Sequence, residues 1–407
     1  MGKNKTKPNW FFWTVYQLAS KIISKNKFHY HVNKDNDFYK RDKSKGAIVL
    51  YNHTCNADHF ISTAFFGKTR ANYVVTRRFD YEKPLHIAFK LVKAIVRDQF
   101  KADMASILKI RKVIDNGGVI CIAPTGQVSI DGVQCHVHSA MVKLLKMCKA
   151  DVYTLRMEGT YLSYPKWSNK NRYYPVNVDC VKVFNGTEIK SLADELVYNK
   201  IVESISIEDL EEQKKKMIPL KGKEHSFGFN TVYYVCPKCL NKYTLINQDD
   251  IIKCSNCGNE IVYNQYGFLE GRGNNYLIPS NEHAWFELEE RLIMKDIQRG
   301  SFFKESIVDF YLNDETNTKL LKVGEGKLVY NIKELYYEGT KDGEDYRKDF
   351  DLSTVYQFPF KPNVRFNIPD NEGMFEFVPH NKIEVTEWAQ IGNSIYRIGV
   401  ENGQNNS

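Results

Sequence analysis

His53 and Asp58 stand five positions apart, directly after an apolar run, in the stretch GAIVLYNHTCNADHF at residues 46–60. A histidine that a carboxylate orients and makes more basic is a general base near neutral pH, suited to taking a proton from a hydroxyl. An apolar run that ends in such residues often marks a buried strand that delivers a site to a sheet edge. The two residues are therefore a candidate catalytic pair, although the spacing by itself also fits ordinary surface polarity.

A second stretch with potential chemistry is GGVICIAPTGQVSIDG, residues 117–132. Its apolar half predicts a strand that ends at Pro124 and Gly126, where Ser129 and the neighbouring backbone N–H groups are available to an anion. Taken alone, this pattern favours an ordinary loop that connects a strand to a helix.

The elements that must position these residues alternate between strand-like and helical patterns. The expected strands are 47–51, 72–76, 118–123, 151–157 and 176–184. Residues 103–118 carry a helical apolar stripe that ends at two glycines, and residues 138–151 repeat the helical pattern. This alternation predicts an α/β domain, a mostly parallel sheet with flanking helices, whose sites lie at the carboxyl ends of strands.

Together these segments resemble the glycerolipid acyltransferase family, typified by lysophosphatidate acyltransferases. NHTCNAD fits the family's NHxxxxD block, KAIVRD its second block, APTGQVS its PEGxxS block and VYTLRMEG its final apolar block, in family order over residues 28–185. The resemblance implies that His53 is the base and that Asp58 orients it. It also implies substrate contacts from Asn52, Arg97, Pro124, Thr125, Gly126 and Ser129.

One departure from the family is Thr125, which replaces the glutamate of PEG. That glutamate is associated in the family with acceptor binding, so its loss points to an altered acceptor. Thr125 can donate a hydrogen bond to a phosphate or a sugar hydroxyl, and it removes a negative charge from the pocket.

The chemistry that the resemblance implies needs no covalent enzyme intermediate. His53 removes a proton from the acceptor hydroxyl, the oxygen attacks the thioester of acyl-CoA or an acyl-carrier protein, and the thiolate leaves. A donor near Gly126 or a backbone amide stabilises the oxyanion. Cys55 lies inside the turn as an alternative nucleophile, but it has no spare base.

Four of the nine cysteines form two tight pairs, CPKC and CSNC, separated by fourteen residues. This spacing resembles a zinc ribbon, in which four thiolates hold a structural zinc ion in a closed tetrahedral site. A redox CxxC is the less favoured reading. The expected ligands are Cys236, Cys239, Cys254 and Cys257.

The remaining cysteines are expected as free thiols in a reducing cytoplasm, because no export signal is visible. They are Cys55, Cys121, Cys135, Cys148 and Cys180. Cys135 with His136 and His138 suggests a second metal site, but polar loop residues are the favoured interpretation because no further ligand pair is present.

The amino-terminal segment, residues 1–27, carries six lysines and no acidic residue, whereas the whole chain has a net charge of only +8. Such a segment suits an anionic surface. Residues 10–23 are too short and polar to span a bilayer, and they lack the cleavage site of a signal peptide. Two interpretations stay open: a helix in the membrane interface with its aromatic residues at the headgroups, or an amphipathic helix packed on the protein's own core.

The chain should therefore contain several parts. They are a basic amphipathic helix (1–27), an α/β acyltransferase domain (28–222) ending in a charged, solvated helix and linker, a zinc ribbon (227–275), a helix capped by Ser280 plus a β-rich domain (276–400), and a disordered tail (401–407). The β-rich part alternates apolar and polar residues between turns. It faintly resembles a pleckstrin-homology-like (PH-like) barrel, and an unspecified β domain packed on the ribbon is the equal alternative.

The leading functional hypothesis is a peripheral enzyme at the cytoplasmic face of a membrane, similar to 1-acylglycerol-3-phosphate O-acyltransferases. Acyl-CoA or an acyl-carrier protein, a lysophospholipid, with lysophosphatidate favoured, and an anionic membrane surface are the expected partners. The alternative is a zinc-ribbon protein that binds nucleic acid or another protein and has an inactive, lipid-binding acyltransferase-like domain. Nucleic acid is disfavoured because the ribbon balances three lysines against two aspartates.

Overall fold

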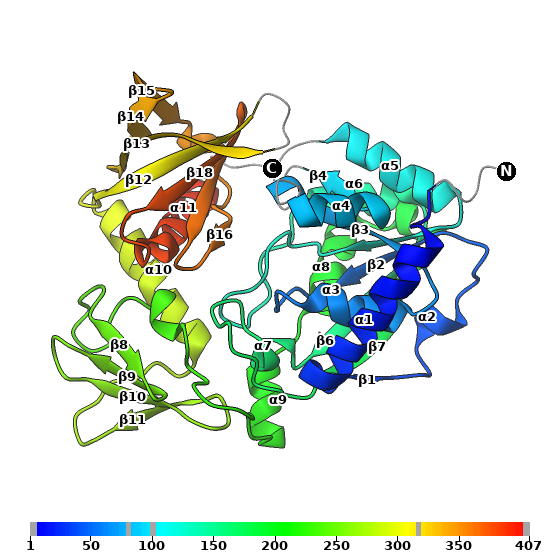
Figure 1. Cartoon of the computed structure of the whole chain (residues 1–407), viewed down its shortest axis with the longest axis horizontal. Helices are drawn as coiled ribbons and strands as arrows, with labels where there is room; N and C mark the ends of the chain where they lie inside the picture. The colour runs from blue at the N-terminus through cyan, green and yellow to red at the C-terminus, as the bar shows by residue number, and fades with distance from the viewer. Residues whose placement is uncertain (1–5, 79–82, 98–102, 315–318, 402–407) are drawn as a thin grey trace. The chain divides into compact units, whose positions relative to one another are not determined.

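The computed structural model describes residues 6–78, 83–97, 103–314 and 319–401, and its elements are labelled in Figure 1. The described residues form two compact units. Unit 1 contains the residues up to 166 together with 170–223, and unit 2 contains residues 167–169 and those from 224 onward. The tail expected at 401–407 lies outside the described residues, apart from Glu401 at the end of a helix.

Unit 1 is built on a seven-stranded sheet with the order β1-β7-β6-β2-β5-β3-β4. All neighbouring strands are parallel except β6 and β7. The carboxyl ends of β2, β6, β5, β3 and β4 therefore meet at one edge of the sheet. The strands are β1 (His31–Val32), β2 (Ala47–Tyr51), β3 (Ala71–Thr76), β4 (Ile95–Arg97), β5 (Val119–Ile122), β6 (Asp151–Glu158) and β7 (Asn177–Phe184).

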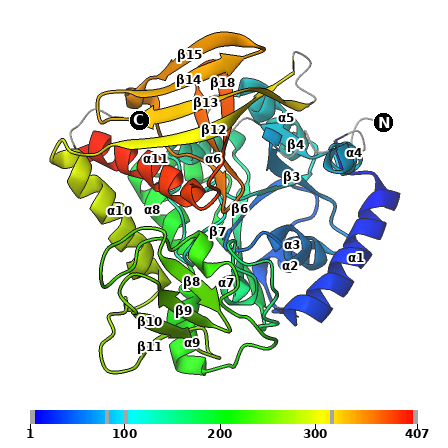
Figure 2. The same cartoon turned by 60° about the vertical axis from the view of Figure 1, so that its left-hand side comes forward.

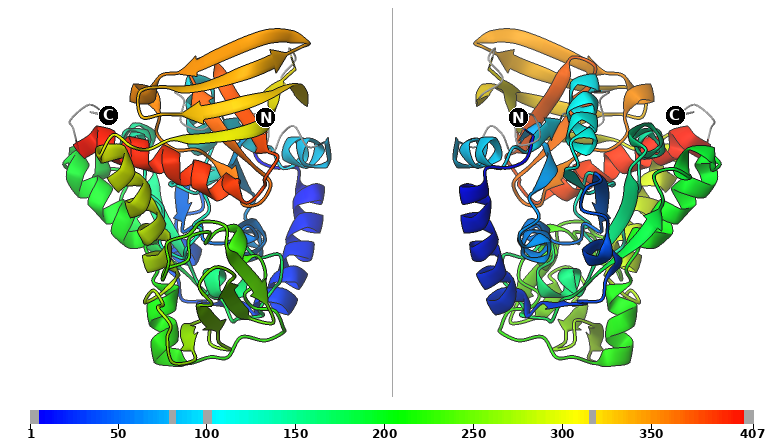
Figure 3. Two further views of the ribbon diagram at one scale, coloured as in Figure 1. Left: turned by 90° about the vertical axis from the view of Figure 1, so that its left-hand side faces the viewer. Right: turned by 90° about the vertical axis from the view of Figure 1, so that its right-hand side faces the viewer.

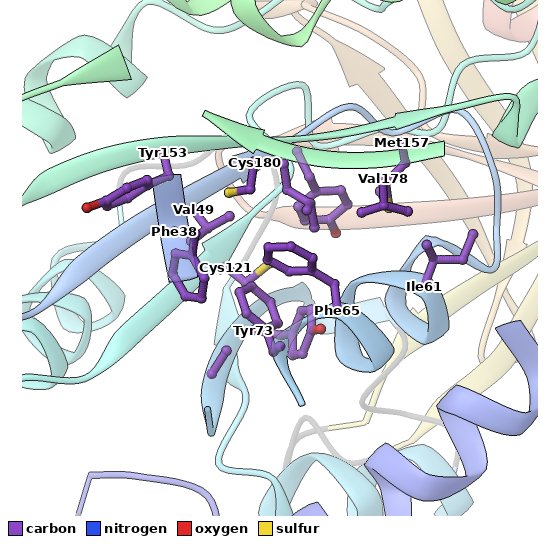
Figure 4. Packing of buried hydrophobic residues seen from close by; sticks show 14 of the residues in the cluster. Phe38, Val49, Ile61, Phe65, Tyr73, Cys121, Tyr153, Met157, Val178 and Cys180 are labelled. Carbon is purple, nitrogen blue, oxygen red and sulfur yellow. The ribbon is translucent and has the colours of Figure 1, made fainter. Parts of the chain in front are cut away.

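Helices cover both faces of this sheet. They are α1 (Trp10–Phe28), α2 (Asp37–Lys40), α3 (Asp58–Phe66), α4 (Lys83–Leu91), α5 (Met104–Asp115), α6 (Ala140–Cys148), α7 (Thr160–Ser163), α8 (Asp194–Ile205) and α9 (Asp209–Lys216). Successive residues of β2 enter two different cores. Val49 packs in a cluster with α1, α2 and α3, shown in Figure 4, whereas Ile48 and Leu50 join α5, α6 and α8. A strand buried on both faces needs an uninterrupted apolar run, which explains the sequence AIVLY.

Helix α1 buries one face in this core. The indole of Trp13 is 2% exposed and donates from Nε1 to the carbonyl of Gly67, the residue that ends α3, at 2.8 Å. The other fully buried positions of α1 follow at helical spacing; they are Ser20, Ser24 and Phe28. Packing on the protein's own core therefore accounts for this face of the helix.

The opposite face of α1 carries an exposed apolar stripe. Its residues recur at i, i+4, i+7 and i+11, which places them on one line about half a turn from the buried face. They are Phe11, Val15, Leu18 and Ile22, each at least half exposed. Among the described residues, no helix is both long and apolar enough to cross a membrane.

Unit 2 begins with a small four-stranded antiparallel sheet of order β11-β10-β9-β8. Its strands are β8 (Leu245–Gln248), β9 (Ile251–Cys254), β10 (Glu260–Tyr263) and β11 (Leu269–Arg272), and α10 (Glu282–Gln298) follows. Asn281 caps α10, because its side chain accepts from the N–H of Ala284 at 2.8 Å. The prediction of Ser280 as the cap was wrong by one residue.

The rest of unit 2 is a seven-stranded antiparallel sheet of order β15-β14-β13-β12-β18-β17-β16, closed by α11 (Glu384–Glu401). A four-stranded and a three-stranded meander are thus joined by pairing between β12 and β18. The β-rich domain is therefore one antiparallel sheet followed by a helix, and its resemblance to a PH-like barrel stays a prediction. The strands are β12 (Lys304–Asn313), β13 (Leu320–Tyr330), β14 (Leu335–Lys341), β15 (Glu344–Phe350), β16 (Phe360–Lys361), β17 (Arg365–Asp370) and β18 (Gly373–Pro379).

Helix α11 packs against this sheet, as Figure 2 shows, and runs beside α10 (Figure 3). The buried indole of Trp388 stacks on Phe366 with ring centroids 5.6 Å apart. Its Nε1 donates to the hydroxyl of Ser306 at 2.9 Å. Trp388 therefore belongs to the core of the carboxy-terminal sheet.

Candidate active site and zinc ribbon

The turn between β2 and α3 carries the predicted catalytic pair. Nδ1 of His53 lies 2.8 Å from Oδ2 of Asp58, and the N–H of Cys55 donates to the same oxygen at 3.2 Å. The side chain of Asp58 is 1% exposed and that of His53 is 21% exposed. The carboxylate is therefore buried while the imidazole reaches the surface.

The electrostatics of the pair suit a general base. Burial raises the pKa of Asp58, and the hydrogen bond and charge of His53 oppose that rise. When Nδ1–H of His53 donates to the carboxylate, Nε2 carries the lone pair that can accept a proton. The turn can thus hold one imidazole tautomer with its basic nitrogen directed away from Asp58.

The turn is anchored to β6 through Asn52. Its side-chain amide donates to the carbonyl of Met157 at 3.0 Å and accepts from the N–H of the same residue at 2.8 Å. Asn52 is fully buried. These two bonds use both the NH2 group and the oxygen of the amide, and they fix the turn to the neighbouring strand. The predicted contact of Asn52 with substrate stays a prediction.

The loop after β5 lies directly against the turn, because the N–H of Ser129 donates to the carbonyl of His53 at 2.8 Å. The hydroxyl of Thr125 donates to the carbonyl of Gln127 at 2.9 Å, and the hydroxyl of Ser129 bonds to Asp131 at 3.2 Å. Both hydroxyl protons are used inside the loop. Their predicted contacts with substrate would require these bonds to be exchanged.

Two residues of this loop set its path. Gly126 has φ +66°, a left-handed conformation that favours glycine, and its N–H donates to the carbonyl of Ala123 at 3.1 Å. Pro124 lies within this tight turn, at the position after Ala123. The sharp reversal brings Ser129 back to His53, and the exposed Gly126 marks its tip.

Arg97 ends β4, at the same sheet edge as the His53 turn. The positive charge of its guanidinium helps to lower the pKa values of two neighbouring side chains, His138 and Asp103. The pKa of His138 is lowered, first by burial and then by the charges of Arg97 and Lys143. The pKa of Asp103 is lowered because hydrogen bonds from Ser106 and the charge of Arg97 outweigh its burial. Arg97 thus lies within electrostatic range of one imidazole and one carboxylate at this edge.

The four predicted zinc ligands converge in unit 2. Their sulfur atoms all lie within 4.8 Å of one another, and Sγ of Cys236 is 3.7 Å from Sγ of Cys257. Sγ of Cys239 is likewise 3.7 Å from Sγ of Cys254. A tetrahedral Zn²⁺ with bonds of about 2.3 Å requires sulfur atoms about 3.8 Å apart, so the four thiols fit such an ion.

Helix α10 supports the first cysteine pair through a buried carboxylate. Oε1 of Glu289 accepts from the N–H groups of Tyr234 and Val235 at 2.7 and 2.8 Å, just before Cys236. Burial raises the pKa of Glu289 well above its usual range, and these N–H donors oppose the rise. The backbone segment that leads into Cys236 is therefore held to α10 by these two hydrogen bonds.

Helix α11 stabilises the segment that follows the first cysteine pair, Cys236 and Cys239. Glu387, 1% exposed, bonds to Tyr243 and pairs with Lys242 and with Lys304, the last at 2.9 Å. Burial raises the pKa of Glu387, but the charges of Lys304 and Lys242 outweigh it and hold that pKa below its usual range. The ribbon and the carboxy-terminal β-rich domain thus share one buried ionic network.

Comparison with known families matches a family model to each of the two regions. The model of the acyltransferase family matches residues 29–158, which contain His53, Asp58, Arg97 and the loop after β5. This segment is an acyltransferase-family domain. A zinc-ribbon family model, described as the 7 kDa subunit of DNA-directed RNA polymerase, matches residues 230–265 and so spans the four cysteines.

Comparison with solved structures found the 1-acyl-sn-glycerophosphate (LPA) acyltransferase PlsC from Thermotoga maritima. The similarity covers 50% of this chain and 81% of that one, with a TM-score of 0.37 and 14% sequence identity. A search of curated proteins found no match.

Cys55 is not arranged as a nucleophile of the acyltransferase domain. It is fully buried, and its sulfur accepts from the N–H of Ala57 at 3.2 Å. Burial and the nearby charge of Asp58 raise the pKa of its thiol well above the usual range. Since the thiolate is the reactive form, this environment disfavours an acyl-enzyme at Cys55.

The segment CHVHS does not assemble a second metal site among the residues that the structure describes. No group of three ligand atoms there includes Cys135, His136 or His138. Nδ1 of His136 instead lies 3.4 Å from the hydroxyl of Tyr198.

Several side chains that bond to the His53 turn come from distant parts of the sequence and were not predicted from it. The N–H of His53 donates to Oε1 of Gln134 at 3.4 Å, and the hydroxyls of Thr54 and Thr160 are 2.6 Å apart. These partners are 81 and 106 residues apart in the chain. Local periodicity carries no signal for such pairs.

Proposed function

We propose that the acyltransferase domain transfers a fatty acyl group from acyl-CoA or an acyl-carrier protein to a hydroxyl of a lysophospholipid-type acceptor in phospholipid synthesis. Lysophosphatidate is the favoured acceptor. The observation that carries this proposal is the 2.8 Å contact between His53 and buried Asp58 at the carboxyl edge of the sheet. The positive charge of Arg97 at the same edge suits an acceptor phosphate.

In the proposed reaction, Nε2 of His53 takes the hydroxyl proton as the acceptor oxygen attacks the thioester carbonyl. The tetrahedral intermediate then collapses, the carbon–sulfur bond breaks, and the thiolate leaves and receives a proton. Asp58 holds the imidazole and stabilises the imidazolium formed during attack. The products are an ester and a free thiol, so the step needs no covalent enzyme intermediate and no further co-reactant.

The substrate assignment is tested with purified protein, labelled acyl-CoA and acyl-carrier protein, and a panel of acceptors. We expect ester formation with lysophosphatidate and a weaker rate with lysophospholipids that lack a phosphate monoester, because Arg97 favours a doubly charged group. Equal rates with neutral and phosphorylated acceptors would contradict the role of Arg97. An absence of ester formation with every acceptor would contradict the proposed function.

We further propose that the exposed stripe of α1 rests in the interface of an anionic membrane. Apolar side chains on one helix face, flanked by lysines, favour such a surface. Changing Phe11 and Leu18 together to serine should lower the fraction of protein that sediments with anionic vesicles about 10-fold or more, since two buried apolar side chains are each worth about 1.5–3 kcal/mol.

The control for the α1 variant is Leu196→Ser, which changes an equally exposed leucine on α8. Vesicle binding of the control should match the unmodified protein. Neutral vesicles and high salt should weaken binding, because Lys21 and Lys25 flank the stripe. If the double variant sediments as well as the control does, the stripe is not the membrane contact.

We also propose that the ribbon binds one structural Zn²⁺ per chain through its four cysteines, as metal analysis of purified protein would measure. Its lysines are engaged within unit 2, which weakens the nucleic-acid alternative. Lys238 donates to the carbonyl of Asn275 at 2.8 Å, and Lys253 pairs with Glu260 at 2.8 Å. A zinc content far below one per chain would remove the metal proposal.

A further inference from the structure

Asp209 is buried at the start of α9, although its sequence neighbourhood, EDLEEQKKK, predicts a solvated helix. The side chain is 3% exposed. Oδ1 accepts from the N–H of Gly159 at 2.7 Å, and Oδ2 accepts from the N–H of Tyr161 at 3.0 Å. Its carboxyl group thus holds the turn that follows β6, outside the segment that matches the acyltransferase family.

The turn that Asp209 holds has a constrained backbone. Gly159 has φ +91°, and a Cβ there would lie 2.4 Å from the carbonyl oxygen of Pro175. Only glycine therefore fits this position without a shift of the backbone. The two N–H groups held by Asp209 flank Thr160, so the carboxyl group fixes the position of that residue from both sides.

Thr160 connects this turn to the catalytic one. Its hydroxyl bonds to the carbonyl of Met157 at 3.0 Å and to the hydroxyl of Thr54 at 2.6 Å. Thr54 directly follows His53, and Asn52, which precedes His53, bonds to both backbone groups of Met157. Both chain neighbours of His53 are thus anchored to the segment that Asp209 clamps.

We propose that Asp209 is a positioning residue for acyl transfer, which fixes the backbone on either side of His53 through the turn at residues 157–161. It acts through Thr160 and Thr54 and makes no contact with the reacting atoms. This inference rests on the proposed role of His53 as the base. The carboxyl group of Asp209 also interacts electrostatically with Asp58 of the catalytic pair. Burial raises the pKa of Asp209 to about 7, the two N–H donors oppose the rise, and the charges of Glu158 and Asp58 add to it.

The test compares Asp209→Ala and Asp209→Asn with Gln213→Ala. Gln213 is equally buried on the same helix, but it bonds to Tyr174 at 2.9 Å and to the backbone of Ile218, whereas Asp209 holds the two N–H groups of the turn after β6. Initial rates of acyl transfer are measured on folded full-length protein, well below the melting temperature of each variant.

For Asp209→Ala we expect kcat to fall roughly 10- to 100-fold, because a small displacement of a catalytic group has effects of this size. The KM values for acyl donor and acceptor should stay within about twofold, since Asp209 touches neither. Asp209→Asn keeps one acceptor oxygen and should be intermediate. Gln213→Ala should lower the melting temperature and leave kcat close to that of the unmodified protein.

An unchanged kcat in Asp209→Ala would overturn the inference, as would an equal loss of kcat in Gln213→Ala, which would mean that only the stability of α9 matters. If Asp209→Ala does not fold, Asp209→Asn decides: a reduced kcat supports the inference and an unmodified kcat overturns it. A His53→Ala variant assayed in parallel separates the two proposals. Full activity there refutes the base assignment, whereas an inactive His53→Ala with a normal Asp209→Ala refutes only the positioning role.

Discussion

Replacing His53 with alanine should lower kcat for acyl transfer by about 10²- to 10⁴-fold, the range of a lost general base. The acceptor hydroxyl would then have no group to take its proton, while Arg97 and the loop after β5 remain in place. KM for the acyl donor should change little. Steady-state rates with lysophosphatidate and acyl-CoA measure both quantities.

The same change should also lower stability modestly. It leaves Asp58 buried without its main partner, and a buried carboxyl group that loses a hydrogen bond costs about 1–3 kcal/mol. The pKa of Asp58 should then rise further above its usual range, because burial already raises it and His53 opposes that rise. Thermal melts therefore accompany the rate measurement, and the assay temperature stays below the transition.

The matched control is His31→Ala, which removes an exposed histidine on β1 and should leave kcat unchanged. Asp58→Asn completes the set. Its amide oxygen could still accept from Nδ1–H of His53 and from the N–H of Cys55, which both bond to the same oxygen, but the negative charge is lost. The imidazolium formed during attack would be less stabilised, so kcat should fall as well. Normal kcat in His53→Ala would show that another group is the base.

Loss of zinc should unfold more than the ribbon. Glu289 and Glu387 are buried carboxylates whose partners lie beside the first cysteine pair, at Tyr234, Val235 and Lys242. If the pair loosens, Glu289 loses two buried hydrogen bonds and Glu387 loses Lys242, and each buried polar group left without a partner costs about 1–3 kcal/mol. Helices α10 and α11 should therefore lose protection from hydrogen exchange by about 10²-fold or more.

A chelator and the Cys236→Ser variant test this expectation, with zinc release and exchange measured on the same protein. Cys135→Ser is the control, because it changes a cysteine outside the cluster and should keep both zinc and protection. Exchange in β2 and α3 of unit 1 should be unaffected. If zinc leaves and α10 and α11 remain protected, the ionic network does not depend on the metal.

The local pattern predicted most elements of unit 1 well. The strand at 47–51 has the predicted bounds, because a strand buried on both faces shows an uninterrupted apolar run whatever its partners are. Helix α1 continues to Phe28, beyond the apolar stretch at 10–23, since its last buried residue packs among the residues of α2 and α3. The chemistry of the cysteine pairs was likewise readable, because four ligands lie within 22 residues.

What the sequence did not reveal depends on contacts between distant residues. Asp209 sits in a run of charges that a helix normally exposes, and its buried oxygens accept from two N–H groups of the turn after β6. Thr125 and Asn52 looked available to substrate, but their polar groups bond to Gln127 and Met157. The pairing of β12 with β18, which joins the two meanders of the carboxy-terminal sheet, connects strands more than sixty residues apart in the chain.

The bond between Trp13 and Gly67 has a consequence for how the enzyme would sit on a lipid surface. It ties α1 to the end of α3, and Asp58 begins α3 nine residues earlier. Tyr16 of α1 also packs on Phe60 near the start of α3, with ring centroids 6.2 Å apart. A bilayer held by the outer stripe of α1 would therefore be connected to the catalytic turn by rigid helix–helix packing, and the distance of the imidazole from the headgroups would not depend on a flexible tether.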